Sequence, residues 1–337
     1  PKNAAFPRKE MMWAEWGLKE KLISDPDVWL CHQCNDCSTN CPRGARPGDV
    51  MAAVRQYVFE NFAVPRFMGK AANKPSALPL LILIPAVLLI AMLFAIHGGE
   101  MGFLDRPVDF AEFFPHKYLE GLFMTGNLVI FILVFMSVFR FYKYLEHSAA
   151  DGKGPGFLPA LGMTLMELFT HKRFTDCGAN KPRAAAHFMV FWGFIGAMIT
   201  AGLAVGLTVL VPIIAYPINL PNPVKILGVV SGLMLIIGGG MLIYRRATGM
   251  DEIGRNGYAD WLFVIFIFLT GLTGMFTFMS RMLDIAWLSY SIYMIHLIIV
   301  FFLLWYAPYT KFAHMFYRTF AITWAKAHNR GKPRIEQ

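Results

Sequence analysis

The chain has 337 residues, of which 56% are hydrophobic, 15% are aromatic and only 16% are charged. This composition excludes an ordinary soluble protein and predicts that most of the chain lies in membrane lipid. The net charge of +9 does not indicate a nucleic-acid partner, because the basic residues gather beside hydrophobic runs, where they set the orientation of membrane helices.

The first 76 residues are polar and mixed in charge, and we expect them to form a domain outside the membrane. Apolar side chains between residues 9 and 22 fall at spacings that share part of one helical face, which predicts a packing helix. The chain begins with Pro1 rather than Met and has no apolar signal-peptide core near its start. We therefore expect that the N-terminus of the protein is incomplete in this sequence.

Four cysteines follow in a C-x2-C-x2-C-x3-C-P pattern, namely Cys31, Cys34, Cys37 and Cys41. This spacing is typical of [4Fe–4S] ligation, in which three cysteines hold one cube and the cysteine before the proline ligates a second. The alternatives are a zinc site or a disulfide pair. Zinc sites favour two separated Cys/His pairs, and a disulfide needs no repeated spacing. The motif predicts two clusters in the full-length protein, with one further ligand from a cysteine upstream of Pro1.

Only Cys177 lies outside this motif, which argues against a disulfide framework and for a reducing compartment. The cysteine domain should therefore be cytoplasmic. After the motif, Asp49 is expected to cap a helix that runs to Phe62. Two helices that flank a cysteine loop predict a small helical ferredoxin-like domain over residues 1–76.

Six apolar runs follow, each long enough for the about 20 helical residues that cross a hydrocarbon core of about 30 Å. We place them near 77–97, 118–142, 185–208, 223–244, 259–280 and 285–307. The predicted fold class is all-α: a small helical ferredoxin-like iron–sulfur domain followed by a six-helix transmembrane bundle. The bundle should occupy residues 77–310, and residues 311–337 should form a cytoplasmic tail.

Lysine and arginine in the connecting segments predict the orientation, because the cytoplasmic side carries the excess. Segments 140–183, 244–260 and the tail after Pro308 hold seven, three and six basic residues. On the opposite side, segments 98–117, 209–222 and 281–284 hold two, none and one. Both termini should thus be cytoplasmic.

Histidines in the apolar half are candidate haem ligands. His296 and His314 are 18 residues apart, and five whole turns of one helix would place both imidazoles on one face, about 27 Å apart. An intramembrane histidine is a functional candidate by default, and neutral imidazole is a common axial ligand of haem iron. The alternative for His296 is a histidine that only hydrogen-bonds a neighbouring helix.

His187 opens the third span, and we predict that His187 and His314 ligate one b haem near the cytoplasmic face. His296 lies nearer the outer side and needs another partner, for which we prefer His116, although that residue could also be an interfacial side chain. His171 is expected to be a surface or quinone-adjacent group rather than a ligand.

The residues also resemble known families. The cysteine motif with Arg43–Asp49 resembles the small iron–sulfur subunit of heterodisulfide reductase. His296 together with Ala307–His314 resembles the nitrate-reductase gamma-subunit type of dihaem cytochrome b. Their fusion, with Phe6–Met11 and Asp27–Cys37, is similar to the C subunits of the quinone-interacting membrane-bound oxidoreductases (Qmo) of sulfate-reducing bacteria.

Two features depart from these families. Members carry an earlier cysteine motif just upstream of the segment at Phe6, which is absent here and is consistent with a missing N-terminus. The gamma-subunit pattern has a second histidine ten residues after His187, and here that position is Ala197. The outer haem therefore has the weaker support, or its ligand comes from another helix.

The resemblance implies two [4Fe–4S] clusters, two b haems and menaquinone as cofactors. It also implies electron exchange with flavin and iron–sulfur partner subunits, ultimately serving adenylyl-sulfate reductase. Two alternatives remain: a nitrate-reductase- or heterodisulfide-reductase-type cytochrome b subunit, and a membrane anchor in which the cluster is structural and the histidines only pack.

Overall fold

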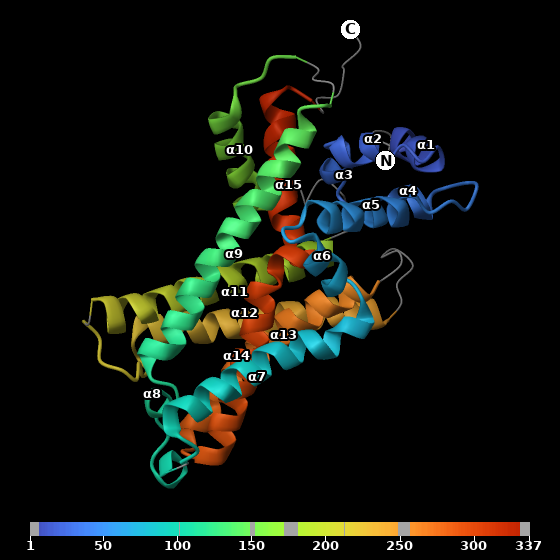
Figure 1. Cartoon of the computed structure of the whole chain (residues 1–337). Helices are drawn as coiled ribbons and strands as arrows, with labels where there is room; N and C mark the ends of the chain where they lie inside the picture. Colours follow the sequence, from blue (N-terminus) through green and yellow to red (C-terminus); the bar gives the residue numbers. More distant parts are fainter. Residues whose placement is uncertain are drawn as a thin grey trace.

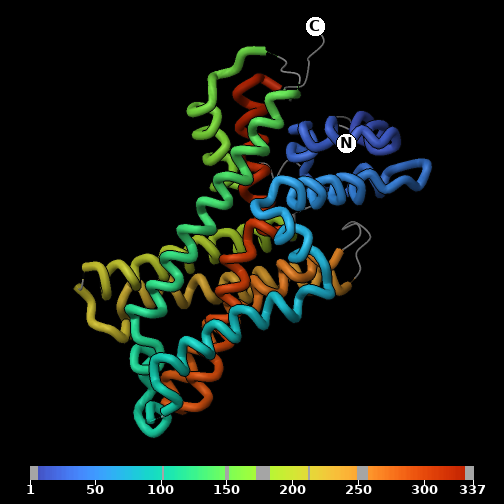
Figure 2. The backbone as a smooth tube through the Cα atoms, viewed as in Figure 1, coloured from blue at the N-terminus to red at the C-terminus, as the bar shows by residue number. Residues whose placement is uncertain are grey.

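The computed structural model of the chain describes residues 7–100, 102–148, 152–171, 181–211, 213–248 and 257–330. These residues form helices and connecting turns, with no strand among them, so the predicted all-α fold class is confirmed. Cys177 lies outside the described residues. Figures 1 and 2 show the N-terminal helices gathered beside one end of a bundle of long helices.

The N-terminal part contains six short helices. Their bounds are α1 Arg8–Glu15, α2 Lys19–Ser24, α3 Asp27–Leu30, α4 Asp36–Thr39, α5 Pro47–Phe62 and α6 Arg66–Ala72. The single helix expected over residues 9–22 is wrong, because Gly17 adopts a φ of +68° that ends α1 and turns the chain into α2. Asp49 does not cap α5: the helix begins at Pro47, and Asp49 lies in its first turn, where it pairs with Arg46 at 2.9 Å.

Among the described residues, six helices are long and apolar enough to cross a membrane, as predicted. The corresponding elements are α7 Leu78–His97, α9 His116–Leu145, α11 Lys181–Val205, α12 Pro223–Ala247, α13 Tyr258–Met282 and α14 Ala286–Trp305. The first span gains a 3-10 turn at Pro75–Ala77, and the third gains a π-helical turn at Gly206–Leu210. Shorter turns join them on one side, namely η2 Gly102–Asp105 and α8 Phe110–Phe113.

Contacts between distant segments show that the first and last spans, α7 and α14, run in opposite directions. At one end, the Tyr309 hydroxyl donates to the Val64 carbonyl at 2.7 Å. At the other end, the Val108 N–H donates to Asp284 Oδ1 at 2.7 Å. We call these the cluster-side end, marked by Val64 and Tyr309, and the distal end, marked by Val108 and Asp284. The N-terminal helices lie at the cluster-side end (Figure 1).

Two further helices complete the cluster-side end: α10 Phe157–Thr170 and α15 His314–Ala327. Helix α9 is longer than a span requires, and its C-terminal part continues alongside α15, which also packs on α10 (Figure 1). The segment expected as a tail therefore contains a packed helix, in which Trp324 is only 1% exposed. The division of the chain into three domains stays a prediction.

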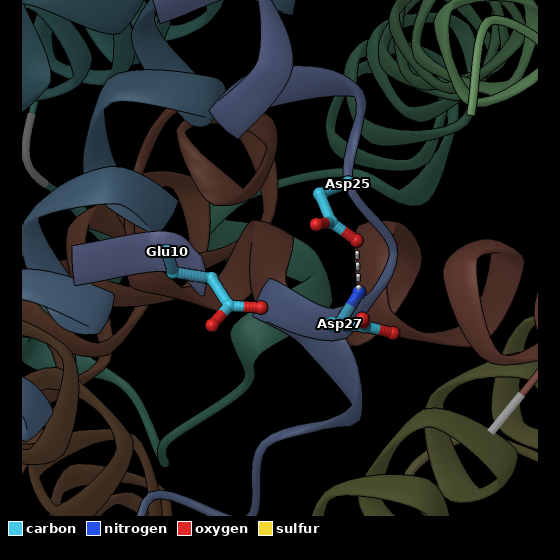
Figure 3. A group of neighbouring side chains, drawn as sticks. All are labelled: Glu10, Asp25 and Asp27. Carbon is cyan, nitrogen blue, oxygen red and sulfur yellow. Dashed lines mark hydrogen bonds between the residues drawn. The ribbon is translucent and has the colours of Figure 1, made fainter. Parts of the chain in front are cut away.

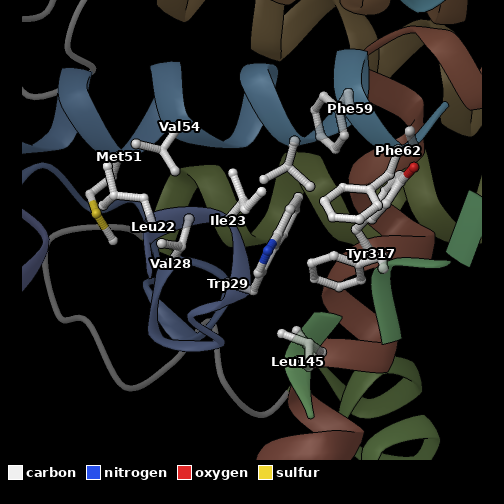
Figure 4. Packing of buried hydrophobic residues seen from close by; sticks show 14 of the residues in the cluster. Leu22, Ile23, Val28, Trp29, Met51, Val54, Phe59, Phe62, Leu145 and Tyr317 are labelled. Atoms are coloured by element: carbon white, nitrogen blue, oxygen red, sulfur yellow. The ribbon is translucent and has the colours of Figure 1, made fainter. Parts of the chain in front are cut away.

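A single apolar core joins the cysteine domain to α9 and α15 (Figure 4). Trp29 of α3 is 1% exposed at its centre. Its ring stacks on Tyr317 of α15 with centroids 5.7 Å apart, and it meets Phe141 of α9 edge-on at 5.7 Å. Because burial of a large aromatic side chain stabilises by about 1.5–3 kcal/mol, this core fixes the cysteine loop against the membrane helices.

An ion-pair network supports the same junction. Figure 3 shows Glu10, Asp25 and Asp27 close together, with ligand oxygens within 4.8 Å of one another. Lys9 Nζ pairs with Asp25 at 2.5 Å and Asp27 at 2.6 Å, and Arg330 reaches both aspartates at 3.1 and 3.3 Å. Lys9 and Arg330 thus pair with these carboxylates, so the group joins the N-terminal helices to the end of α15.

The expectation that His296 and His314 share one helix is wrong. Helix α14 ends at Trp305, two 3-10 turns follow at Ala307–Tyr309 and Lys311–Ala313, and His314 opens α15. Pro308 lies in the first of these turns, where its missing N–H and fixed φ do not support a continuous helix. The five-turn argument therefore does not relate the two imidazoles.

Candidate iron–sulfur and haem sites

The four cysteines lie on one irregular loop between α3 and α5. Cys31 is the C-cap of α3, Cys34 follows in the loop, Cys37 lies in α4 and Cys41 comes two residues after the end of α4. The four side chains are partly buried and are not joined by disulfides. Burial raises the pKa of the Cys37 thiol, and an iron cluster would offset this cost because metal binding removes the thiol proton.

Two residues with positive φ shape this loop. Gln33 has a φ of +52° and Asn35 a φ of +65°, a region that non-glycine residues seldom adopt and that asparagine tolerates best. The turn at Gln33 directs its backbone N–H to Cys31 Sγ at 3.4 Å. Hydrogen bonds to sulfur are one of the means by which proteins set the potential of iron–sulfur clusters.

Arg55 of α5 binds the loop from inside the domain. Its side chain is buried, and its Nε and Nη2 both donate to the Val28 carbonyl, at 2.9 and 2.7 Å. Nη2 also donates to the Cys31 carbonyl at 2.9 Å, and Nη1 donates to Gln33 Oε1 at 2.7 Å. The planar guanidinium therefore fixes three acceptors of the loop at once.

The spacing of the four cysteines favours an iron–sulfur cluster over a single zinc ion, because zinc sites favour two separated pairs of ligands.

At the cluster-side end, the structure places His187 and His314 near enough for their charges to interact. It also adds a third histidine: His171 at the end of α10 is 8% exposed, and its Nε2 lies 3.1 Å from His187 Nδ1. The expectation that His171 lies at the surface is therefore wrong. Burial lowers the pKa of His171, so a neutral ring that shares one proton with His187 is the favoured form.

His314 is oriented as a metal ligand needs. Its Nδ1 lies 2.6 Å from the Lys311 carbonyl, and a carbonyl only accepts, so Nδ1 carries the proton and Nε2 keeps the lone pair. Burial lowers the pKa of His314 to about 4, although the bond to the Lys311 carbonyl opposes this shift. The imidazole is thus neutral at pH 7, which ligation of iron requires.

His296 lies in the middle of α14 and has a similar arrangement. The Thr273 hydroxyl donates to the Leu269 carbonyl at 2.7 Å and has no second proton. It must therefore accept from His296 Nδ1, 2.9 Å away, which leaves Nε2 with the lone pair. The ring lies against Gly274, where an added Cβ would come within 3.0 Å of it.

His116 lies at the distal end, and the structure gives it different partners from those of His296. Its Nδ1 pairs with Glu120 at 2.8 Å, and its ring meets Tyr216 edge-on at 4.6 Å. His116 Nε2 is buried with no hydrogen-bond partner among the described residues. Histidines that bind metal through one nitrogen often donate the other N–H to a carboxylate in this way. Ala197, at the position of the absent histidine, packs in an apolar cluster with Val190 and Leu235.

Arg55 and Arg183 both bind Gln33 and, with Arg246, lie near Lys311, whose Nζ pairs with Asp260. Burial first, and then repulsion from nearby arginines, lowers the pKa of Lys311 well below its ordinary value. These arginines are Arg246, Arg183 and Arg55. A concentration of cations suits anionic groups such as a thiolate-bound cluster or the carboxylates of a haem.

Arg55, Arg183 and His171 were not identified from the sequence. Arg55 had a usable signal, because it shares the face of α5 that carries Met51, Val58 and Phe62, all buried. A single arginine on such an apolar stripe indicates a buried hydrogen-bonding role. Arg183 and His171 had no such sequence signal, because each belongs to a basic segment that resembles an ordinary cytoplasmic connection between membrane helices.

Comparisons with known proteins give one long and several short matches. Citrate utilization protein B of Escherichia coli is 26% identical over 332 residues, which cover 90% of this chain and 82% of that protein. A protein of Archaeoglobus profundus that is like the C subunit of heterodisulfide reductase is 42% identical over 48 residues, 14% of this chain and 26% of that protein. The C subunit of the H2:CoB-CoM heterodisulfide,ferredoxin reductase of Methanothermobacter marburgensis is 43% identical over 42 residues, 12% and 23%.

The short matches fall on the cysteine-rich N-terminal stretch and bear out the resemblance to the small iron–sulfur protein of heterodisulfide reductase there. They support an iron–sulfur site at the four cysteines and an electron-transfer role beside an oxidoreductase. The chain spans about a quarter of the length of these heterodisulfide reductase relatives. No family profile and no solved structure matches the chain.

Proposed function

We propose that the chain is the membrane subunit of a respiratory oxidoreductase complex of the Qmo kind. In this role it exchanges electrons between menaquinone, b haems and [4Fe–4S] clusters and delivers them to flavin and iron–sulfur partner subunits. The complex would serve adenylyl-sulfate reductase in sulfate respiration. The cysteine domain and both termini face the cytoplasm, in agreement with the basic residues at the cluster-side end.

The observation that carries the proposal is the junction at the cluster-side end. The cysteine loop is hydrogen-bonded to α11, the helix that bears His187, and His187 lies beside His314. A membrane anchor with a structural cluster gives no reason for a neutral, oriented histidine pair at this place. A chain of one-electron centres gives such a reason, because electron-transfer centres must lie close together.

We assign the residues to groups as follows. Cys31, Cys34 and Cys37 hold one cube, and Cys41 ligates a second cube. His187 and His314 hold the haem at the cluster-side end through Nε2. When bound, haem and clusters accept and release one electron at a time. The chain itself orients the ligands, keeps them neutral and surrounds them with positive charge.

The second haem is assigned to His296 and His116. Each has its Nδ1 engaged, by Thr273 and by Glu120. This pair has less support than the first, because no contact joins the two rings among the described residues. Menaquinone is proposed from the resemblance alone.

The test uses the complete complex purified from native membranes, with haem, iron and sulfide measured per chain. We expect low-spin b-haem absorbance that a menaquinol analogue reduces, together with iron for two cubes. Cys34→Ala should remove one cluster signal and Cys41→Ala the other, while haem absorbance stays. His147→Ala, a change at an exposed histidine, is the control that should change nothing. A complex without haem would refute the proposal, and the loss of one and the same cluster in both cysteine variants would refute the two-cube assignment.

A second candidate function follows from the long match. Because citrate utilization protein B aligns with 90% of this chain, an electron-transfer protein of this kind could instead serve an enzyme of citrate use. Deletion of the gene in the source organism separates the two. Loss of growth on sulfate with normal use of citrate supports the first function, and the reverse result supports the second.

A further inference from the structure

Arg183 makes a contact that neither the cysteine motif nor the histidine pattern predicts. Its Nη1 donates to the Gln33 backbone carbonyl at 2.6 Å, across 150 positions of sequence. Gln33 stands between the cluster ligands Cys31 and Cys34, and its left-handed φ turns the backbone within the loop. The carbonyl that Arg183 binds is thus part of the immediate surroundings of the proposed cluster.

The same side chain belongs to the proposed haem helix. Arg183 precedes His187 by four residues in α11, which is about one helical turn, or roughly 6 Å along the axis. Its charge interacts with Cys34 on one side and with His187 on the other. One cation therefore touches the surroundings of both predicted redox sites.

Arg55 makes this contact rigid from the opposite side. While Arg183 holds the Gln33 carbonyl, Arg55 Nη1 holds Oε1 of the same glutamine at 2.7 Å. Gln33 N–H in turn approaches Cys31 Sγ at 3.4 Å. Gln33 is thus bound at its N–H, its carbonyl and its side chain, so a movement of α11 is transmitted to the cysteine loop.

We propose that Arg183 is a positioning residue that couples the two redox sites, through its bond to Gln33 and its place one turn before His187. It fixes the cysteine loop against the haem-bearing helix, and its positive charge raises the reduction potential of both sites. This inference rests on the proposed function, since it requires a cluster at the cysteines and a haem at His187. A cation stabilises the reduced form of each site, which carries one more negative charge.

The experiment compares redox titrations of the complete complex carrying Arg183→Gln, Arg183→Lys or Arg106→Gln. Arg183→Gln should lower the equilibrium constant for reduction at both sites, the cluster held by Cys31 and Cys34 and the cluster-side haem. We expect a decrease of about tenfold in each, equivalent to about 59 mV for one electron. Arg183→Lys keeps the charge but not the planar fork, so its potentials should lie closer to those of the wild type.

Arg106→Gln is the matched control, because Arg106 is exposed, pairs with Glu112 and lies at the distal end. It should leave both potentials unchanged. Hydrogen exchange supplies a reading that does not depend on bound cofactors: Arg183→Gln should increase exchange in residues 31–41 more than Arg106→Gln does.

The outcomes separate this inference from the proposed function. A wild-type complex without haem or iron refutes the function itself. If the wild type has its normal cofactors but Arg183→Gln shifts the reduction potential of only one site or of neither, the coupling is overturned and the proposed function is not. A lysine variant that shifts as far as the glutamine variant would overturn the role of the charge. If Arg183→Gln does not accumulate, Arg183→Lys is compared with the wild type instead. The inference then requires that hydrogen exchange in residues 31–41 increases while both reduction potentials stay unchanged.

Discussion

Arg55→Met is the substitution that tests most directly how the cysteine loop is held. Methionine keeps an unbranched apolar stem in the buried site but donates no hydrogen bond. Three acceptors then lose their partner: the carbonyls of Val28 and Cys31, and Oε1 of Gln33. The positive charge beside Cys31 is also lost. Burial lowers the pKa of Arg55, and its interaction with Cys31 opposes this shift.

The magnitude follows from the burial of each acceptor. Val28 is 0% exposed, so its carbonyl would stay unsatisfied at a cost of about 1–3 kcal/mol. Cys31 and Gln33 are partly exposed, and water can replace part of each lost bond, which leaves about 0.5–1.5 kcal/mol apiece. The sum is about 2–6 kcal/mol, a large part of the about 5–15 kcal/mol by which a typical domain is stable.

The assay is iron content together with hydrogen exchange in residues 28–41 of the full chain in its complex. We expect Arg55→Met to lose iron and protection in this segment while b-haem absorbance stays, because the histidine ligands are on other helices. Arg55→Lys should be intermediate, since one ammonium cannot reach all three acceptors. Arg46→Met is the control, because Arg46 is about half exposed and pairs with Asp49. Full iron content and unchanged protection in Arg55→Met would show that the loop is held by other contacts.

Three further predictions follow. His314→Ala should remove one low-spin haem signal and leave the cluster signals, and retention of every haem signal would contradict the assignment. Lys9→Met should lower the stability of the N-terminal helices by about 1–3 kcal/mol, because Asp25 is 1% exposed and loses a partner. Burial lowers the pKa of Lys9, but its bonds to Asp25 and Asp27 raise it above 10.5 overall. The contribution of Lys9 to stability is therefore complete below pH 10.5 and disappears as the pH rises through the pKa of Lys9 in the folded protein. Hydrogen exchange measures the stability difference between Lys9→Met and the wild type. A difference that persists well above pH 10.5 would be inconsistent with this network. Reporter fusions should place position 110 in the periplasm and position 330 in the cytoplasm. Activity of a periplasmic reporter at 330 would contradict the predicted topology.

Much of the fold was predictable because the bilayer imposes a simple rule. A span must be long and apolar, so the six helices could be placed within a few residues of their observed ends. The helices outside the membrane obey no such rule. α10 and α15 are short, and their packing depends on partners distant in the sequence, such as Trp29 on Tyr317. Gly17 broke an otherwise plausible helical pattern through its backbone conformation alone.

The candidate site divides in the same way. Cysteines and histidines stand out in a sequence because few other roles require them at such places. The residues that orient them, Arg55 and Arg183, are ordinary arginines until the fold brings them to Gln33. Sequence patterns thus predict the ligands of a redox centre more readily than the hydrogen bonds that set its geometry and potential.

His314 shows how the structure can bring a predicted residue near its predicted partner although the geometric premise was wrong. The 18-residue interval suggested one straight helix, but the chain turns twice between Trp305 and His314. These turns place His314 at the first residue of α15, where its ring reaches back to the Lys311 carbonyl and its neighbour across the bundle is His187. A continuous helix would instead carry His314 straight on along the axis of α14. The break after Trp305 is therefore the structural feature that makes the cluster-side histidine pair possible.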